Sequence, residues 1–195
     1  MTAPEDSVRA LVAWVEANLE RLRLVPCVEV SDEFGEELLR VDEHLGVEVG
    51  EKDAGDREVI VTAFSEPRLF PLVQRIVDGL PKVPGWRFVA LKPPRGFDFT
   101  LTVGKYPVDA EDFAFAPLPD VDRGIHLLHP ERILENLSRK DAAELAWLVV
   151  ETGIGEELAS RLRHVKISDT DGGRGWHPIA ELESYVRENV AQGAE

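Results

Sequence analysis

The segment from Arg57 to Pro93, REVIVTAFSEPRLFPLVQRIVDGLPKVPGWRFVALKP, constrains the fold more than any other part of the chain. Apolar side chains alternate from Glu58 to Phe64, follow helical spacing from Leu69 to Val77, and form a second short run from Trp86 to Leu91. These patterns predict a strand, a helix and a strand. Two strands joined through a helix lie parallel in one sheet, so the segment predicts a βαβ unit.

Two helices are expected before this unit. The first follows an apolar stripe from about Ala3 to Arg23, and the second should begin after Ser31, whose hydroxyl can cap it. A strand from Val47 to Glu51 should pair with the run from Glu58 to Phe64 as a hairpin.

The remaining elements lie after Pro93. Alternating residues predict strands at Phe97 to Thr102, Gly124 to His129 and His164 to Ser168. Ser138 and Asp141 have the spacing of a capping box before a helix, and Ile179 to Val190 reads as a closing helix.

This order of elements predicts an α+β fold, with a mainly antiparallel sheet that contains the βαβ unit and with helices largely on one face. Without the extra strands the order is βαββαβ, which is the ferredoxin-like order. The length of 195 residues fits a single domain, 1–195. Within it, 1–46 would be an N-terminal helical segment and 47–195 the α+β core.

The charge of the chain restricts its partners. Lys and Arg number 22 against 37 Asp and Glu, which leaves a formal net charge of −15. A surface this acidic repels phosphate backbones and anionic lipids. We therefore expect neither nucleic-acid binding nor membrane binding. Cys27 is the only cysteine, which excludes an intrachain disulfide, and the N-terminus lacks the pattern of a secretory signal. A cytoplasmic protein is therefore expected.

Motifs of catalysis and cofactor binding are not apparent in the sequence. Ser65 is not framed as G-x-S-x-G, and its hydroxyl is better explained as a helix cap. His126 and His129 lie three apart in a predicted strand, where they would point to opposite faces, so no metal site is expected from them. Asp169 to Gly173 resembles the start of a calcium loop, but Ala180 stands where its bidentate Glu should be. We predict no catalytic residue, metal or cofactor.

Four carboxylates form the most suggestive cluster, namely Asp98, Asp109, Glu111 and Asp112. Paired carboxylates can perform acid–base chemistry or hold magnesium, and these lie in an irregular segment, where sites tend to occur. A chain this acidic also produces such clusters by chance, and a solvated acidic loop is the favoured interpretation. Trp176 is the tryptophan expected to be exposed, which makes it a candidate interface residue.

Three segments carry a resemblance, Leu69 to Pro93, Val108 to Pro119 and Ala143 to Ile167. In these segments the chain resembles a family of uncharacterised bacterial cytoplasmic α/β proteins. The resemblance spans about half of the chain. It implies an α/β protein of the bacterial cytoplasm and supplies no activity and no catalytic residues.

Two hypotheses about function result. The first is a non-enzymatic interaction or regulatory protein of the bacterial cytoplasm, which binds a protein partner or a second copy of the chain. In a homodimer, the strand at Phe97 to Thr102 would be the open edge that pairs with the second copy. The alternative is a small enzyme or ligand-binding protein that uses Asp98, Asp109, Glu111 and Asp112, with or without a divalent metal. The sequence favours the first.

Overall fold

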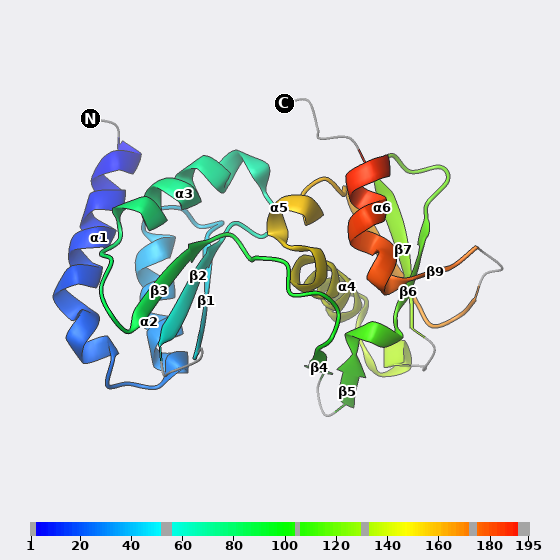
Figure 1. Cartoon of the computed structure of the whole chain (residues 1–195), viewed down its shortest axis with the longest axis horizontal. Helices are drawn as coiled ribbons and strands as arrows, with labels where there is room; N and C mark the ends of the chain where they lie inside the picture. Colours follow the sequence, from blue (N-terminus) through cyan, green and yellow to red (C-terminus); the bar gives the residue numbers. More distant parts are fainter. Residues whose placement is uncertain (1–2, 52–55, 104–105, 130–132, 172–174, 191–195) are drawn as a thin grey trace. The chain divides into compact units, whose positions relative to one another are not determined.

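A computed structural model describes residues 3–51, 56–103, 106–129, 133–171 and 175–190 of the chain (Figure 1). Its contacts divide the chain into two compact units, Met1–Lys92 and Pro93–Glu195. The sequence placed a boundary at residue 46 inside one domain, whereas the contacts place the N-terminal helices in one unit with the first three strands. In the described ranges, no helix combines the length and the apolar character that a membrane span requires.

The first unit contains a three-stranded sheet and three α-helices. Its elements are α1 (Ala3–Leu22), α2 (Cys27–Leu39), β1 (Gly46–Glu51), β2 (Arg57–Thr62), the short 3-10 helix η2 (Pro67–Leu69), α3 (Phe70–Gly79) and β3 (Trp86–Ala90). The strand order is β1-β2-β3, with β1 antiparallel and β3 parallel to β2. The predicted hairpin and the predicted βαβ unit, β2-α3-β3, are both confirmed.

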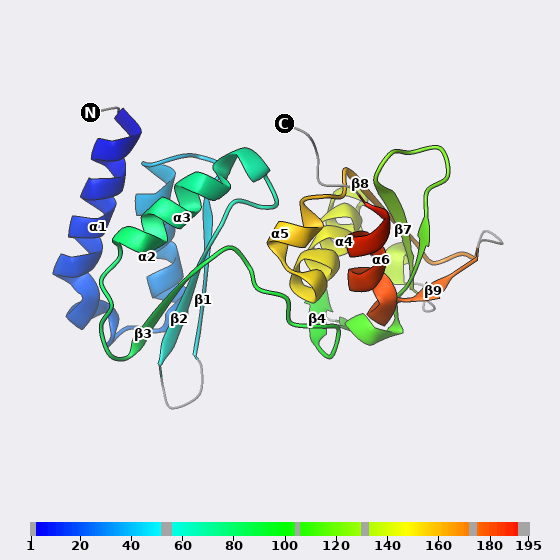
Figure 2. The ribbon, with the colours of Figure 1, turned by 45° about the horizontal axis from the view of Figure 1, so that its top comes forward.

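All three helices lie on one side of this sheet (Figures 1 and 2). Val59 and Val61 alternate along β2 and are fully buried in the same apolar cluster as Val15, Phe34 and Val73 of the helices. Ile60, between these two valines, is buried as well, so the central strand β2 is buried on both faces and carries three consecutive apolar residues.

Two details of the first unit differ from expectation. Helix α2 begins at Cys27, directly after Pro26, and not after Ser31. The reason is that Val30 is buried with Phe34 and Leu38, which extends the apolar stripe by one turn. Ser65 was wrongly expected to cap a helix, because Glu66 is the N-cap of η2 and no side chain caps it.

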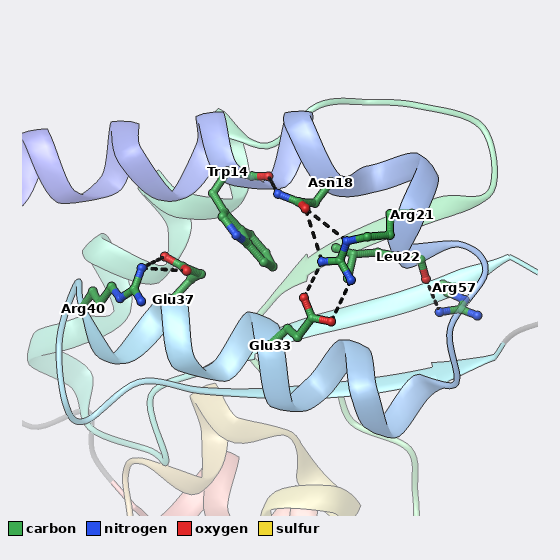
Figure 3. A network of polar contacts seen from close by, with 8 residues as sticks. All are labelled: Trp14, Asn18, Arg21, Leu22, Glu33, Glu37, Arg40 and Arg57. Atoms are coloured by element: carbon green, nitrogen blue, oxygen red, sulfur yellow. Dashed lines mark hydrogen bonds and ion pairs between the residues drawn. The ribbon is translucent and has the colours of Figure 1, made fainter.

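Helices α1 and α2 are joined by an ion pair that Figure 3 shows from close by. Arg21 donates to both carboxylate oxygens of Glu33, and Asn18 Oδ1 also accepts from this guanidinium at 3.2 Å. The hydrogen bond to Arg21 is the main cause that holds the pKa of Glu33 below its ordinary value, and the same bond raises the pKa of Arg21. Asn18 in turn donates to the Trp14 carbonyl at 2.8 Å.

The second unit contains two sheets and three α-helices. Its strands are β4 (Thr100–Val103), β5 (Tyr106–Asp109), β6 (Ala114–Pro117), β7 (Gly124–Leu128), β8 (His164–Ser168) and β9 (His177–Pro178). Its α-helices are α4 (Arg139–Ile154), α5 (Glu156–Ala159) and α6 (Leu182–Asn189), and its 3-10 helices are η3 (Ala110–Asp112), η4 (Ile133–Asn136) and η5 (Ile179–Glu181). Strands β4 and β5 form an antiparallel pair, and the other sheet has the order β8-β7-β6-β9.

The larger sheet of this unit holds a second βαβ unit. Strand β7 is followed by α4 and then by β8, and β7 and β8 are parallel neighbours. Ile125 and Leu127 of β7 are fully buried in one cluster with Val149 of α4 and Val186 of α6. The residues between them in β7, including His126, therefore belong to the opposite face of the sheet.

The α+β class is confirmed, and four of the six strand pairings are antiparallel. The described strands form three sheets, whereas a ferredoxin-like βαββαβ order would place its strands in one. The strand expected at Phe97 to Thr102 is shorter, because the chain before β4 packs on α4 instead. The backbone N–H of Gly96 donates to the Gly153 carbonyl at 3.0 Å, and the Phe97 ring is buried against Gly153.

Candidate functional site

The parallel strands β7 and β8 end at one edge of their sheet, and α4 begins beside that edge. The chain leaves β7 at Leu128 and enters α4 at Arg139, so the N-terminus of α4 lies near the carboxyl ends of both strands. Ligands of open α/β sheets bind in the crevice outside the carboxyl ends of parallel strands. The second βαβ unit therefore brings side chains of β8 and of the first turn of α4 to a location suited to binding.

A pocket of about 400 Å³ lies beside the first turns of α4 and along the middle of β8. Its volume is within the range of about 300–1,000 Å³ that is typical of small-molecule sites. Most of its wall is aliphatic and comes from η4, α4 and β8, namely Leu134, Leu137, Ala142, Ala143, Val165 and Ile167. The polar part of the wall consists of His126, Ser138, Arg139 and Lys166. The pocket thus combines an apolar wall with a small number of polar groups.

The polar groups of the pocket are mainly basic. Arg139 is the first residue of α4. Lys166 of β8 is the register partner of His126 of β7, so these two side chains belong to the face of the sheet opposite the one that packs on α4, and the pocket extends around the edge strand β8. Within the described part of the chain, neither Arg139 nor Lys166 has an ion-pair partner, whereas Lys140, the neighbour of Arg139, lies 3.5 Å from Glu144. The chain as a whole has a net charge of −15, whereas this pocket carries two cationic side chains in its wall.

Ser138 has a structural role at the rim of the pocket. Its Oγ accepts a hydrogen bond from the Asp141 backbone N–H at 3.2 Å, as the capping-box spacing predicted. This bond fixes where α4 begins, and it thereby positions Arg139 at the pocket.

Trp176 is placed next to a pocket residue. Its ring meets the His126 ring edge to face, with 5.3 Å between the centroids, and its Nε1 donates to Asp171 Oδ1 at 2.7 Å. Trp176 is half-buried, and not exposed as the sequence suggested. Because Trp176 packs on His126, its fluorescence should respond to a ligand that binds in the pocket.

The four predicted carboxylates are not among the residues that line the pocket. Asp98, Asp109, Glu111 and Asp112 are all exposed, and Asp109 Oδ1 accepts a hydrogen bond from Thr100 Oγ1 across the β4-β5 pair at 2.5 Å. Glu111 and Asp112 belong to η3. Among the residues that the structure describes, no group of three or more His, Cys, Asp or Glu side chains is placed to hold a metal ion.

The remaining candidates from the sequence have other surroundings. His129 is buried, with its ring 4.7 Å from that of Phe113, whereas His126 packs on Trp176, so the two histidines have separate environments. Of the segment that resembled a calcium loop, Asp171 accepts the bond from Trp176, and Gly172 and Gly173 lie outside the described residues.

Sequence reasoning missed Arg139 and Lys166. They are 27 positions apart (166 − 139), and only the parallel pairing of β7 with β8 brings them to one pocket. The signal available was the order of a strand, the Ser138 cap, a helix and a strand, which is the pattern of a second βαβ unit.

Comparisons of the chain with models of known protein families, with curated proteins and with solved structures give no match. The pocket is therefore interpreted from its own geometry and chemistry.

Proposed function

We propose that the protein is a non-enzymatic binding protein, of an interaction or regulatory kind, and that its second unit holds a small ligand in the pocket between α4 and β8. The observation that carries the proposal is the pocket itself, which has a volume of about 400 Å³, a largely aliphatic wall and the polar side chains of Arg139, Lys166 and His126.

The pocket chemistry is suited to binding. The cationic side chains of Arg139 and Lys166 can hold and orient a ligand, but an arginine does not act as a proton acceptor at physiological pH. Ser138 is engaged as the cap of α4, and the His126 ring packs on Trp176. These groups supply recognition, and the aliphatic wall supplies burial.

A ligand screen with a pocket-filling variant tests the proposal. Ala143 is exposed and lines the pocket, so Ala143→Phe should obstruct it without disturbing the core. Ala17→Phe, at an exposed position of α1, is the matched control. We expect compounds from a fragment library to raise the melting temperature of the wild type and of Ala17→Phe but not of Ala143→Phe, since a ligand of the native state stabilises it. Hits that bind Ala143→Phe equally well would contradict the proposal.

The alternative function uses the carboxylates Asp98, Asp109, Glu111 and Asp112. No observation in the described residues favours it over the pocket. A rise in melting temperature with Mg²⁺, Mn²⁺, Ca²⁺ or Zn²⁺ that is lost in Asp109→Asn, or turnover in a hydrolase and phosphatase screen, would support it in place of the binding proposal.

The proposal includes the expectations about partners and place in the cell. We expect a cytoplasmic bacterial protein that belongs to the family it resembles, that interacts with a protein partner or with a second copy, and that binds neither nucleic acid nor membrane. The single cysteine and the net charge of −15 support these expectations. Cell fractionation tests the location, and the mass in solution by light scattering tests for a homodimer.

A further inference from the structure

We infer that the ligand of the pocket is an aliphatic monocarboxylate, whose carboxylate is held by Arg139 and Lys166 and whose alkyl part lies against Leu134, Leu137 and the first two turns of α4. This inference rests on the proposed function and specifies its ligand class.

The charge of the ligand follows from the two cations. A chain with 37 acidic and 22 basic residues can neutralise most of its cations internally, as Lys140 shows by its approach to Glu144. Among the described residues Arg139 and Lys166 have no ion-pair partner, as is also true of Arg75, Lys82 and Arg161, and what distinguishes Arg139 and Lys166 is that both line one pocket. A planar carboxylate matches the fork of the Arg139 guanidinium, and an ammonium such as that of Lys166 can approach the second side of the same group.

The net charge also limits how highly charged the ligand can be. A net charge of −15 opposes the approach of any anion, and it opposes a dianion more than a monoanion. Two cations are enough to hold a single carboxylate, so a monoanion balances the local attraction against the overall repulsion better than a phosphate monoester.

The wall and the volume specify the rest of the ligand. At roughly 30 Å³ for each water-sized group, a pocket of about 400 Å³ holds on the order of thirteen such groups. The apolar part of the wall is entirely aliphatic and includes Leu134, Leu137, Val165 and Ile167. A medium-length alkyl chain with a terminal carboxylate, such as octanoate, fits both the size and the polarity.

The test is isothermal titration of the full chain at low salt with octanoate and with octyl phosphate, octylamine and octanol as comparison ligands. The variants are Arg139→Gln and Lys166→Gln, with Lys140→Gln as the matched control, since all three side chains are exposed and only the first two line the pocket. We expect octanoate to bind the wild type and Lys140→Gln equally. Its affinity should fall about tenfold in each of the other variants, because each loses a charge-assisted hydrogen bond. Added salt should weaken the binding.

Several outcomes would overturn the inference. Octanol or octylamine binding as tightly as octanoate would show that the pocket does not select an anion, and tighter binding of octyl phosphate would show that it selects a dianion. Equal losses in Lys140→Gln and Arg139→Gln would show that the effect is not local. If no ligand of this set binds, the inference fails. In each of these cases the proposed function is judged separately by the fragment screen with Ala143→Phe.

Discussion

Arg57, the first residue of β2, completes the end of α1. Its guanidinium donates to the carbonyls of Leu22 at 2.7 Å, Arg23 at 3.2 Å and Val25 at 2.5 Å, and it lies 5.8 Å from the centroid of the Trp86 ring (Figure 3 shows the bond to Leu22). The last carbonyls of a helix lack partners within the helix. The planar guanidinium of Arg57, with several fixed donors, satisfies one such carbonyl at Leu22 and two more in the segment after α1, which a lysine ammonium cannot do in the same geometry.

We therefore expect Arg57→Lys to lower the free energy of unfolding by about 1.5–3 kcal/mol, the range for hydrogen bonds to charged groups. Urea denaturation of the full chain measures the change. Arg40→Lys is the control, because Arg40 forms an exposed pair with Glu37 at 2.7 Å and exposed pairs contribute little. Similar effects of the two substitutions would contradict a specific role for Arg57.

Asp42 is an acidic residue whose pKa is shifted by a backbone contact. Its Oδ1 accepts from the His44 backbone N–H at 2.9 Å and lies 3.2 Å from His44 Nδ1. The backbone hydrogen bond is the main cause that lowers the pKa of Asp42, and the side chain of His44 adds a smaller contribution. Because the pKa is lower in the folded state, the resulting stability is present above the unfolded pKa and is lost as the pH falls through the folded value.

His44→Ala keeps the backbone N–H that donates to Asp42. The pKa of Asp42 should therefore rise only part of the way toward its ordinary value and stay below it. An NMR titration of the Asp42 carboxyl carbon measures this in the folded protein. Return of the Asp42 pKa to its ordinary value in His44→Ala would show that the imidazole, and not the backbone, is the main cause.

At the scale of elements, two helical glycines face different surroundings. A Cβ added at Gly35 of α2 would meet its nearest neighbour, Val47 Cγ1, at 3.7 Å, which is an ordinary contact. A Cβ added at Gly153 of α4 would lie 2.1 Å from the Phe97 ring. Gly153 thus allows the chain after Pro93 to pack on α4, whereas Gly35 has no such role.

We expect Gly35→Ala to stabilise the protein by about 0.5–1 kcal/mol, the usual gain in a helix interior. Gly153→Ala should destabilise it by roughly 1–2 kcal/mol, because overpacking costs up to about 3 kcal/mol and exceeds the helical gain. Thermal unfolding measures both changes. Adding Phe97→Leu to Gly153→Ala should recover part of the loss, and a purely additive double variant would contradict the proposed contact.

The elements were predictable where one local signal specified them. The strand, helix and strand from Arg57 to Pro93, the helix after Ser138 and the hairpin were all predicted, because their periodicity and turns lie within short segments. The start of α2 was misplaced because a plausible cap at Ser31 competed with the burial of Val30, and burial prevailed. The length of β4 was misjudged because alternation at Phe97 and Phe99 reflects packing in the core and not pairing in a sheet.

The pocket was not predictable in the same way. Its cations, Arg139 and Lys166, come from separate elements, and their proximity depends on the pairing of β7 with β8, which no local pattern encodes. The sequence drew attention to Asp109 and its neighbours instead, because adjacent carboxylates are conspicuous in a linear chain. Trp176 was the one predicted residue that the structure places beside a pocket residue.

At the scale of the whole molecule, each unit has its own apolar core. One cluster of buried residues draws its members only from Val8 to Trp86, and the other only from Phe97 to Val190. Phe34 and Phe115 are matched positions in the two clusters, since each side chain is about 1% exposed. Regions whose buried apolar residues form separate clusters can open as separate cooperative units.

We expect Phe34→Leu to accelerate amide hydrogen exchange in residues 3–92 and to leave the protected amides of residues 93–190 unchanged, with the reverse for Phe115→Leu. Each substitution should cost roughly 1–2 kcal/mol, less than the 3–5 kcal/mol of truncation to alanine, so the full chain stays folded during the measurement. Hydrogen exchange with mass spectrometry on the full chain locates the effect by peptide. If either substitution accelerates exchange equally in both units, the two cores unfold as one, and the division at Lys92 has no thermodynamic meaning.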